Sequence, residues 1–350
     1  MRPLSFIAFA VVSLALLAGA VYTVVTERGT TTVATGNAPM FPDLKAHIND
    51  AGEIEVANNA GHLTIKREGE DWKLVEKQGY PVPFDKPKDL LIALADLKML
   101  EPKTKDATRY ERLAVQDIGP KASDAVRITV KDRAGRTLAA AIFGRRNESL
   151  YGKMGGGTYL RRVGEDQAWL AEGTVKVGVT HKEWVDRVIV DLKKKDVKRV
   201  AMHHPGEGSF VASKADANRK NLTLERMPEG RKLKSDGEID GIVEIMDKLD
   251  LEDVKKATDV EFPVPGHSVE FSTFDGMIVR VEATSPKQYV YWAKFSARVA
   301  PEAAEPDKVR AEVEKINARV NGWAYEIAAG YGEKVMKKLE ELLDEKKPAS

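Results

Sequence analysis

The sequence contains no cysteine among its 350 residues, and neither sign of charge predominates. Without cysteine the chain forms neither a disulfide framework nor a thiolate metal site, and it offers no cysteine for lipid attachment. Its 55 basic and 54 acidic residues give a net charge of +1, so no strong field attracts nucleic acid. A Gly-x-Ser-x-Gly nucleophile elbow is also missing. These absences argue against several enzyme classes and against nucleic acid as a partner.

The one long apolar run is Leu4–Val25, which carries no charged side chain. At about 1.5 Å per residue, a helix of this length spans the ~30 Å hydrocarbon core of a bilayer. We expect residues 1–28 to be a single-pass transmembrane anchor in a bacterial inner membrane, with the body in the periplasm. Two alternatives remain: a signal peptide cleaved after Ala20, and a buried helix of a soluble protein. Residues 29–45 are polar and small, which predicts a tether.

The body has an internal repeat that predicts an α+β fold of two duplicated units, residues 46–190 and 191–300. Each unit contains antiparallel hairpins packed on a helix. The helix of the first unit and that of the second show the same apolar spacing 152 positions apart: Leu90, Leu91, Leu94, Leu97 and Met99, then Ile242, Val243, Met246, Leu249 and Leu251. In this alignment Phe210 corresponds to Trp72, and Asp275-Gly276 predicts a tight hairpin turn.

Residues 301–350 are predicted to form a C-terminal helical segment with one short strand. Apolar residues at helical spacing mark two helices: Val309, Val313, Ile316 and Val320, then Val335, Met336, Leu339, Leu342 and Leu343. Between them Trp323, Tyr325 and Ile327 alternate with other residues, as in a strand.

No pattern in the sequence predicts a catalytic, cofactor-binding or metal-binding residue. His203-His204 is the only adjacent histidine pair, and neighbouring strand residues point to opposite faces, so the pair is a poor metal site. Gly155–Gly157 lacks the Lys-Ser/Thr and the helix that follow the glycines of a phosphate-binding loop. The five tryptophans, Trp72, Trp169, Trp184, Trp292 and Trp323, suit core packing, with an aromatic platform for glycans as the alternative.

Several short motifs resemble the bacterial domain of unknown function 4340 family. They are Gly69-Glu70-Asp71-Trp72-Lys73-Leu74, Gly156-Gly157-Thr158-Tyr159-Leu160-Arg161-Arg162, Gln167-Ala168-Trp169-Leu170, Trp184-Val185-Asp186-Arg187, Trp323-Ala324-Tyr325-Glu326-Ile327 and Leu339-Glu340-Glu341-Leu342-Leu343. The resemblance implies a membrane-anchored, exported protein, often encoded beside ABC-type permeases and gliding-motility-type subunits. It implies no activity and no catalytic residues.

Together these observations predict a non-enzymatic, membrane-anchored extracytoplasmic accessory or binding protein. Its expected partners are the inner membrane, through Leu4–Val25, and an ABC transporter permease or another envelope protein. A periplasmic glycan- or lipid-binding module is the alternative, and an uncharacterised hydrolase is a third interpretation. No cofactor is expected.

Overall fold

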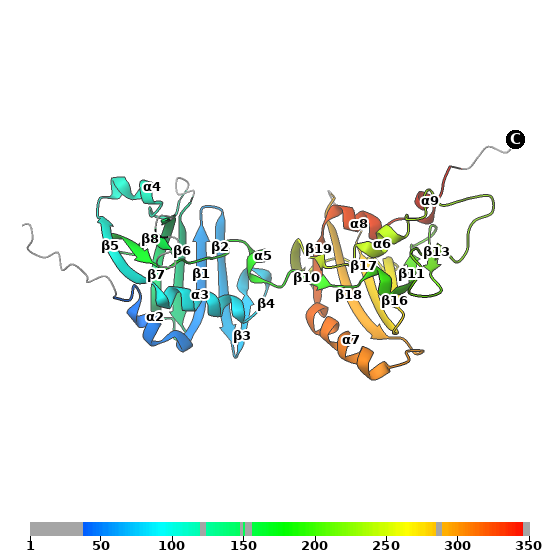
Figure 1. Cartoon of the computed structure of the whole chain (residues 1–350), viewed down its shortest axis with the longest axis horizontal. Helices are drawn as coiled ribbons and strands as arrows, with labels where there is room; N and C mark the ends of the chain where they lie inside the picture. Colours follow the sequence, from blue (N-terminus) through cyan, green and yellow to red (C-terminus); the bar gives the residue numbers. More distant parts are fainter. Residues whose placement is uncertain (1–37, 120–123, 148–149, 151–155, 285–288, 346–350) are drawn as a thin grey trace, which may run out of the picture.

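The computed structural model describes residues 38–119, 124–147, 150, 156–284 and 289–345. The predicted anchor Leu4–Val25 and most of the tether lie outside these residues. Within the described part, no helix combines the length and the apolar character needed to span a bilayer. The fold is α+β, as predicted, with antiparallel strand pairing and several helices (Figure 1).

A nine-stranded sheet forms the first unit, in the order β4-β3-β2-β1-β6-β7-β8-β9-β5. Its strands are β1 (Ala51–Asn58), β2 (Gly61–Glu68), β3 (Asp71–Leu74), β4 (Tyr80–Val82), β5 (Lys98–Thr104), β6 (Val126–Asp132), β7 (Thr137–Asn147), β8 (Gly157–Arg162) and β9 (Ala168–Glu172).

An eight-stranded sheet forms the second unit, in the order β13-β12-β11-β16-β17-β18-β19-β15. Its strands are β11 (Val197–His203), β12 (Phe210–Ser213), β13 (Thr223–Leu224), β15 (Asp253–Lys256), β16 (His267–Thr273), β17 (Met277–Ala283), β18 (Tyr291–Val299) and β19 (Trp323–Ile327). A separate two-stranded pair joins β10 (Val188–Val190) to β14 (Leu249–Asp250).

Eight α-helices connect and cover the strands of the described chain. They are α2 (Pro42–Ala46), α3 (Asp85–Asp96), α4 (Tyr110–Leu113), α5 (His181–Trp184), α6 (Asp240–Glu244), α7 (Pro306–Val320), α8 (Ala329–Val335) and α9 (Leu339–Leu342). Short 3₁₀ turns occur at η1 (Ile48–Asp50), η2 (Val75–Lys77), η3 (Ala107–Arg109), η5 (Lys194–Asp196) and η6 (Ala257–Asp259).

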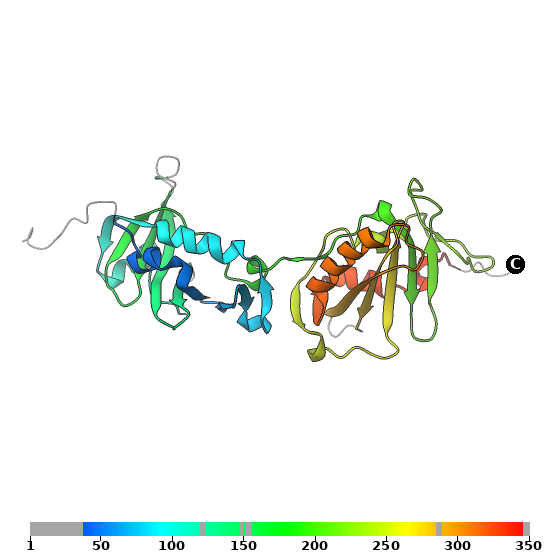
Figure 2. The ribbon, with the colours of Figure 1, turned by 90° about the horizontal axis from the view of Figure 1, so that it is seen from below.

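The two longest helices bury the apolar faces that their sequences predict. In α3, Pro87 occupies the first turn, where a missing N–H costs no helical hydrogen bond, and Leu90, Leu91 and Leu94 are buried. In α7, Val309, Val313, Ile316 and Val320 are buried, and the helix packs on β18 (Figure 2). The second sheet therefore has one face covered by α7.

Among the described residues, the strand orders of the two large sheets correspond one to one, apart from β4, which has no counterpart in the second sheet. In both units the segment before the first strand also pairs with the segment after the helix, through Pro39 with Lys98 and Val188 with Asp250. A register shift follows the first residue of β1 and of β11, where each pairs with the next hairpin.

Four details differ from the sequence prediction. By strand order, Phe210 on β12 corresponds to β2, not to Trp72 on β3. Both predicted helices are shorter than their apolar spacing, since the first ends at Asp96, with Met99 in β5, and the second ends at Glu244, with Leu249 in β14. Leu339 begins a separate short helix, so the last predicted helix is two. The boundaries at 190 and 300 also cut paired strands, since β10 pairs with β14 and β19 pairs with β18.

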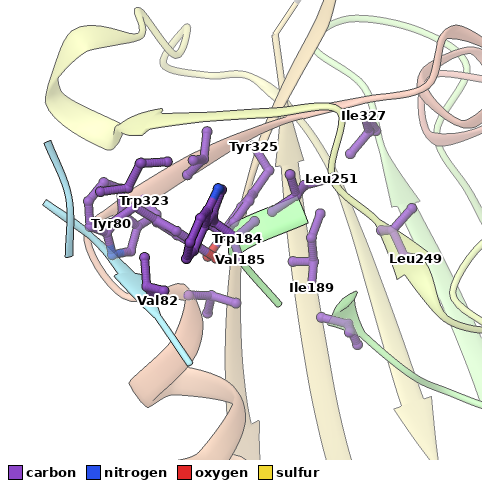
Figure 3. Packing of buried hydrophobic residues seen from close by; sticks show 14 of the residues in the cluster. Tyr80, Val82, Trp184, Val185, Ile189, Leu249, Leu251, Trp323, Tyr325 and Ile327 are labelled. Atoms are coloured by element: carbon purple, nitrogen blue, oxygen red, sulfur yellow. The ribbon is translucent and has the colours of Figure 1, made fainter. Parts of the chain in front are cut away.

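The two units meet through aromatic side chains of β4 and β19 (Figure 3). The ring of Tyr80 lies edge-on to Trp323, with centroids 4.8 Å apart, and to Tyr325, at 6.3 Å. All three side chains are buried. Around them, Lys77 Nζ lies 2.5 Å from Asp253 Oδ1, and Gln78 Nε2 donates to Asp259 Oδ2 at 2.6 Å. One continuous hydrophobic cluster therefore runs through both units.

This joint places the two sheets end to end. The described chain begins beside β5, at the edge of the first sheet opposite β4. Beyond the joint, the second sheet runs from β15 to β13 at the other end of the molecule (Figure 1). With strands about 4.8 Å apart, β12 lies roughly 70 Å from β5, measured along the sheets.

Candidate functional site

A groove of about 840 Å³ crosses the second sheet on the face opposite α7, near its far edge. Alternation along each strand puts Ala201 and His203 of β11, Glu270 of β16 and Arg280 of β17 on this face, because cross-strand partners share a side. The groove is thus floored by alternate residues of strands whose other residues form the core.

Ion pairs cover the floor of this groove. Glu270 lies 3.3 Å from Arg280 and 3.2 Å from Arg298, and Arg280 Nε donates to Glu282 Oε1 at 3.1 Å. Burial raises the pKa of Glu282, but hydrogen bonds from Lys294 and Arg280 outweigh it, so the net shift is downward. Glu282 therefore remains ionised at neutral pH and poorly suited to act as a general acid.

The wall of the groove is the segment 225–228, which follows β13. It is held to the sheet by a hydrogen bond from Glu225 N to Val211 O, 2.9 Å long, and by the Arg199–Glu225 ion pair at 3.1 Å. Met227 lines the groove and is 45% exposed. A wall that includes Met227 and Pro228, over an ion-paired floor, can bind a segment that carries both apolar and polar groups.

A pair of histidines, of which His204 is buried and His267 is part-exposed, lies directly behind the groove. The Nδ1 atoms of His204 and His267 are 2.7 Å apart, and His204 Nε2 lies 2.9 Å from the carbonyl of Lys337. A carbonyl only accepts, so His204 carries its proton on Nε2, and the proton between the rings comes from His267 Nδ1. Burial lowers the pKa of both rings. The neutral pair therefore ties β11 and β16 to the segment that leads into α9.

His203 and His204 point to opposite sides of the strand end, as predicted for this adjacent pair. His203 is exposed and lines the groove, whereas His204 is 2% exposed. No group of three or more histidine, aspartate or glutamate side chains suited to a metal ion occurs in the described ranges.

The glycine run and the tryptophans are placed as follows. Gly155 lies outside the described residues, and Gly157 begins β8, so a strand follows this run as predicted. Trp72, Trp184 and Trp323 are buried, which agrees with core packing. Trp169 and Trp292 are part-exposed, and Trp292 lines a second cavity.

A buried lysine near the groove strands has a structural explanation. Lys214 is 5% exposed, and its Nζ donates to the carbonyls of Lys194 and Lys195, each at 3.0 Å. Burial lowers the pKa of Lys214. Its ammonium is committed to two backbone acceptors, so it serves to hold η5 against the end of β12.

The groove itself was not anticipated from the sequence. Its floor comes from strands up to 79 positions apart, and its charged pairs are formed across strands, which no local spacing reveals. The segment after β13 supplies Met227 and Pro228 of the groove wall, and no periodic pattern in the sequence marks it as a binding surface.

Comparison with known proteins identifies the family. The family model described as "Domain of unknown function (DUF4340)" matches residues 72–263, more than half of the chain. No curated protein and no solved structure matches the chain. The chain therefore belongs to the DUF4340 family, in agreement with the resemblance of its motifs.

Proposed function

We propose that this member of the DUF4340 family is a membrane-anchored extracytoplasmic binding protein without enzymatic activity, associated with an ABC-type transport system. In this proposal Leu4–Val25 crosses the inner membrane, and the described residues lie in the periplasm. The groove on the second sheet then binds a segment of a transporter subunit or of another envelope protein.

The end-to-end arrangement of the two sheets is the observation that carries the proposal. The described chain begins at the β5 edge of the first sheet, and the groove lies near the opposite end of the molecule. The buried aromatic joint favours a fixed relation between the units, because both contribute to one core. Such a body would hold its groove away from the membrane, where a partner's extracytoplasmic part is accessible.

Site-specific crosslinking tests this role. A photoreactive amino acid is placed at Met227, in the groove wall, or at Val163, an equally exposed control at 47% on the first unit. Irradiation of intact membranes should attach a permease subunit, identified by mass spectrometry, to the Met227 variant only. Capture of cytoplasmic proteins alone, or the same products from both positions, would contradict the proposal.

The membrane topology requires its own experiment. A reporter that is active only in the periplasm is fused after Ser350, and the membrane and soluble fractions are assayed separately. Activity in the membrane fraction supports an uncleaved anchor, and activity in the soluble periplasmic fraction supports cleavage after Ala20. An inactive reporter on a stable fusion would refute the extracytoplasmic location.

A glycan- or lipid-binding module is the second candidate, and the cavity beside the part-exposed Trp292 favours it.

We also propose that the two units arose by duplication. Their shared strand order, the paired segments before each first strand and the matching register shifts support this origin.

A further inference from the structure

A second cavity, of about 390 Å³, lies on the same face of the second sheet as the groove but near β15. The segment 259–263 forms one wall, and the adjacent ends of β17 and β18 form the other. Its lining comprises Lys255, Asp259, Val260, Glu261, Pro263, Thr284, Val290 and Trp292. The volume is within the range of small-molecule sites.

Trp292 supplies a held but accessible aromatic surface in this cavity. Its backbone N–H donates to Thr284 Oγ1 at 3.3 Å, and strand pairing fixes its position opposite Glu326. The side chain is part-exposed, unlike the buried tryptophans of the core. Lys255 Nζ lies 4.6 Å from the ring centroid. The ammonium group therefore lies over one face of the ring, and both border the cavity.

Among the described residues, three polar groups around this ring have no hydrogen-bond or ion-pair partner. Neither the Lys255 ammonium, nor the Glu261 carboxylate, nor the Trp292 indole N–H makes a hydrogen bond or ion pair within the part of the chain described. Asp259 differs, because it accepts from Gln78 and Thr258. The cavity therefore combines two free donors, one free acceptor and an aromatic face.

We propose that this cavity binds a saccharide unit of a glycan. A sugar ring offers an apolar C–H face to Trp292, while its hydroxyl groups can donate to Glu261 and accept from Lys255. An acyl chain would make no polar contact with Lys255 or Glu261, whose exposed charges border the cavity. A phosphate group would meet the negative charges of Glu261 and Asp259. Saccharide hydroxyls match both signs of the lining.

This assignment names the ligand class of the second candidate function, on which it rests, and is independent of the proposed partner binding. The cavity and the groove share no lining residue, so a substitution in one leaves the other intact. Loss of sugar binding and loss of the Met227 crosslink are therefore separate results.

Saturation-transfer NMR and calorimetry on the full-length chain in detergent test the site. The probes are chitotriose, cellotriose, maltotriose and a muropeptide digest of peptidoglycan. At least one should bind the unchanged protein. Trp292→Ala should weaken that binding by about tenfold or more, and Glu261→Gln by about threefold or more, since each removes a distinct contact.

Trp169→Phe is the matched control, because Trp169 is also part-exposed but lies on β9 of the first unit. It should leave affinity unchanged. If Trp292→Ala fails to fold, Glu261→Gln and Lys255→Met test the site instead, because both replace exposed side chains. The proposal is overturned if no probe binds, if the cavity variants bind as tightly as the unchanged protein, or if they lose binding to phosphatidylglycerol vesicles instead of sugars.

Discussion

Replacing Tyr80 with alanine should weaken the joint between the two units. Tyr80 is 4% exposed and contacts the rings of Trp323 and Tyr325 in the other unit. Truncating a buried aromatic side chain costs about 3–5 kcal/mol of unfolding free energy. Each aromatic pair adds about 0.5–1.5 kcal/mol beyond burial, so about 1–3 kcal/mol of that loss belongs to contacts across the joint.

Urea unfolding of Tyr80→Ala, Trp323→Ala and the double variant measures this coupling. The cycle should return at least about 1 kcal/mol, because the two rings touch directly. Tyr80→Phe keeps the ring and loses only a hydroxyl 3.5 Å from Tyr325 Oη, so it should cost less than about 1 kcal/mol.

Ile128→Ala is the control for general destabilisation, since Ile128 is 1% exposed in the core of the first unit. It should lower stability without coupling to Trp323→Ala. Additive effects of Tyr80→Ala and Trp323→Ala would refute a joint built on these aromatic contacts, even if both variants were strongly destabilised.

Three further predictions concern stability. Burial lowers the pKa of His204 and His267 below 6.5, so the folded protein binds fewer protons than the unfolded chain near that pH. The free energy of unfolding in urea should therefore be retained above pH 6.5 and fall below it, by at most about 1.4 kcal/mol per pH unit for each ring. His267→Gln should reduce this slope. A loss of stability as the pH rises above 6.5 would be inconsistent with a histidine pair that is neutral in the folded protein. Lys214→Met leaves the carbonyls of Lys194 and Lys195 without their donor and should cost about 1–3 kcal/mol; an unchanged midpoint in urea would argue against that role. Gly332→Ala places a methyl group into the Tyr291 ring and should destabilise by about 1–3 kcal/mol in thermal unfolding, whereas Gly330→Ala on the same helix meets nothing within 4 Å; equal effects would rule out close packing as the cause.

Local patterns predicted the elements of this fold better than their extent. The leucines of α3 and the valines of α7 repeat at helical spacing and are buried, so both helices followed from the sequence. Leu249 continues the apolar spacing of α6 but lies in β14. An apolar residue just after a helix fits the helical spacing even when it belongs to the next strand. Strand pairing decides such cases, and it depends on distant segments.

The candidate sites were less accessible to prediction. Glu270 and Arg298 meet across strands 28 positions apart, and the His204–His267 pair spans 63 positions. A spacing rule within one segment does not find such contacts. Trp292 was noted only as one of five tryptophans, and its partial exposure beside Lys255 became visible with the tertiary structure.

The unmatched strand β4 has a consequence for how many units such a chain can join. It docks against the β15 side of the following unit, and β15 corresponds to β5, so the contact is head-to-tail and could in principle be repeated. Within the residues that the structure describes, the second sheet ends at β13 and has no counterpart of β4. In this part of the chain the contact is therefore made once, and a third unit docked in the same way would require a further strand beside β13.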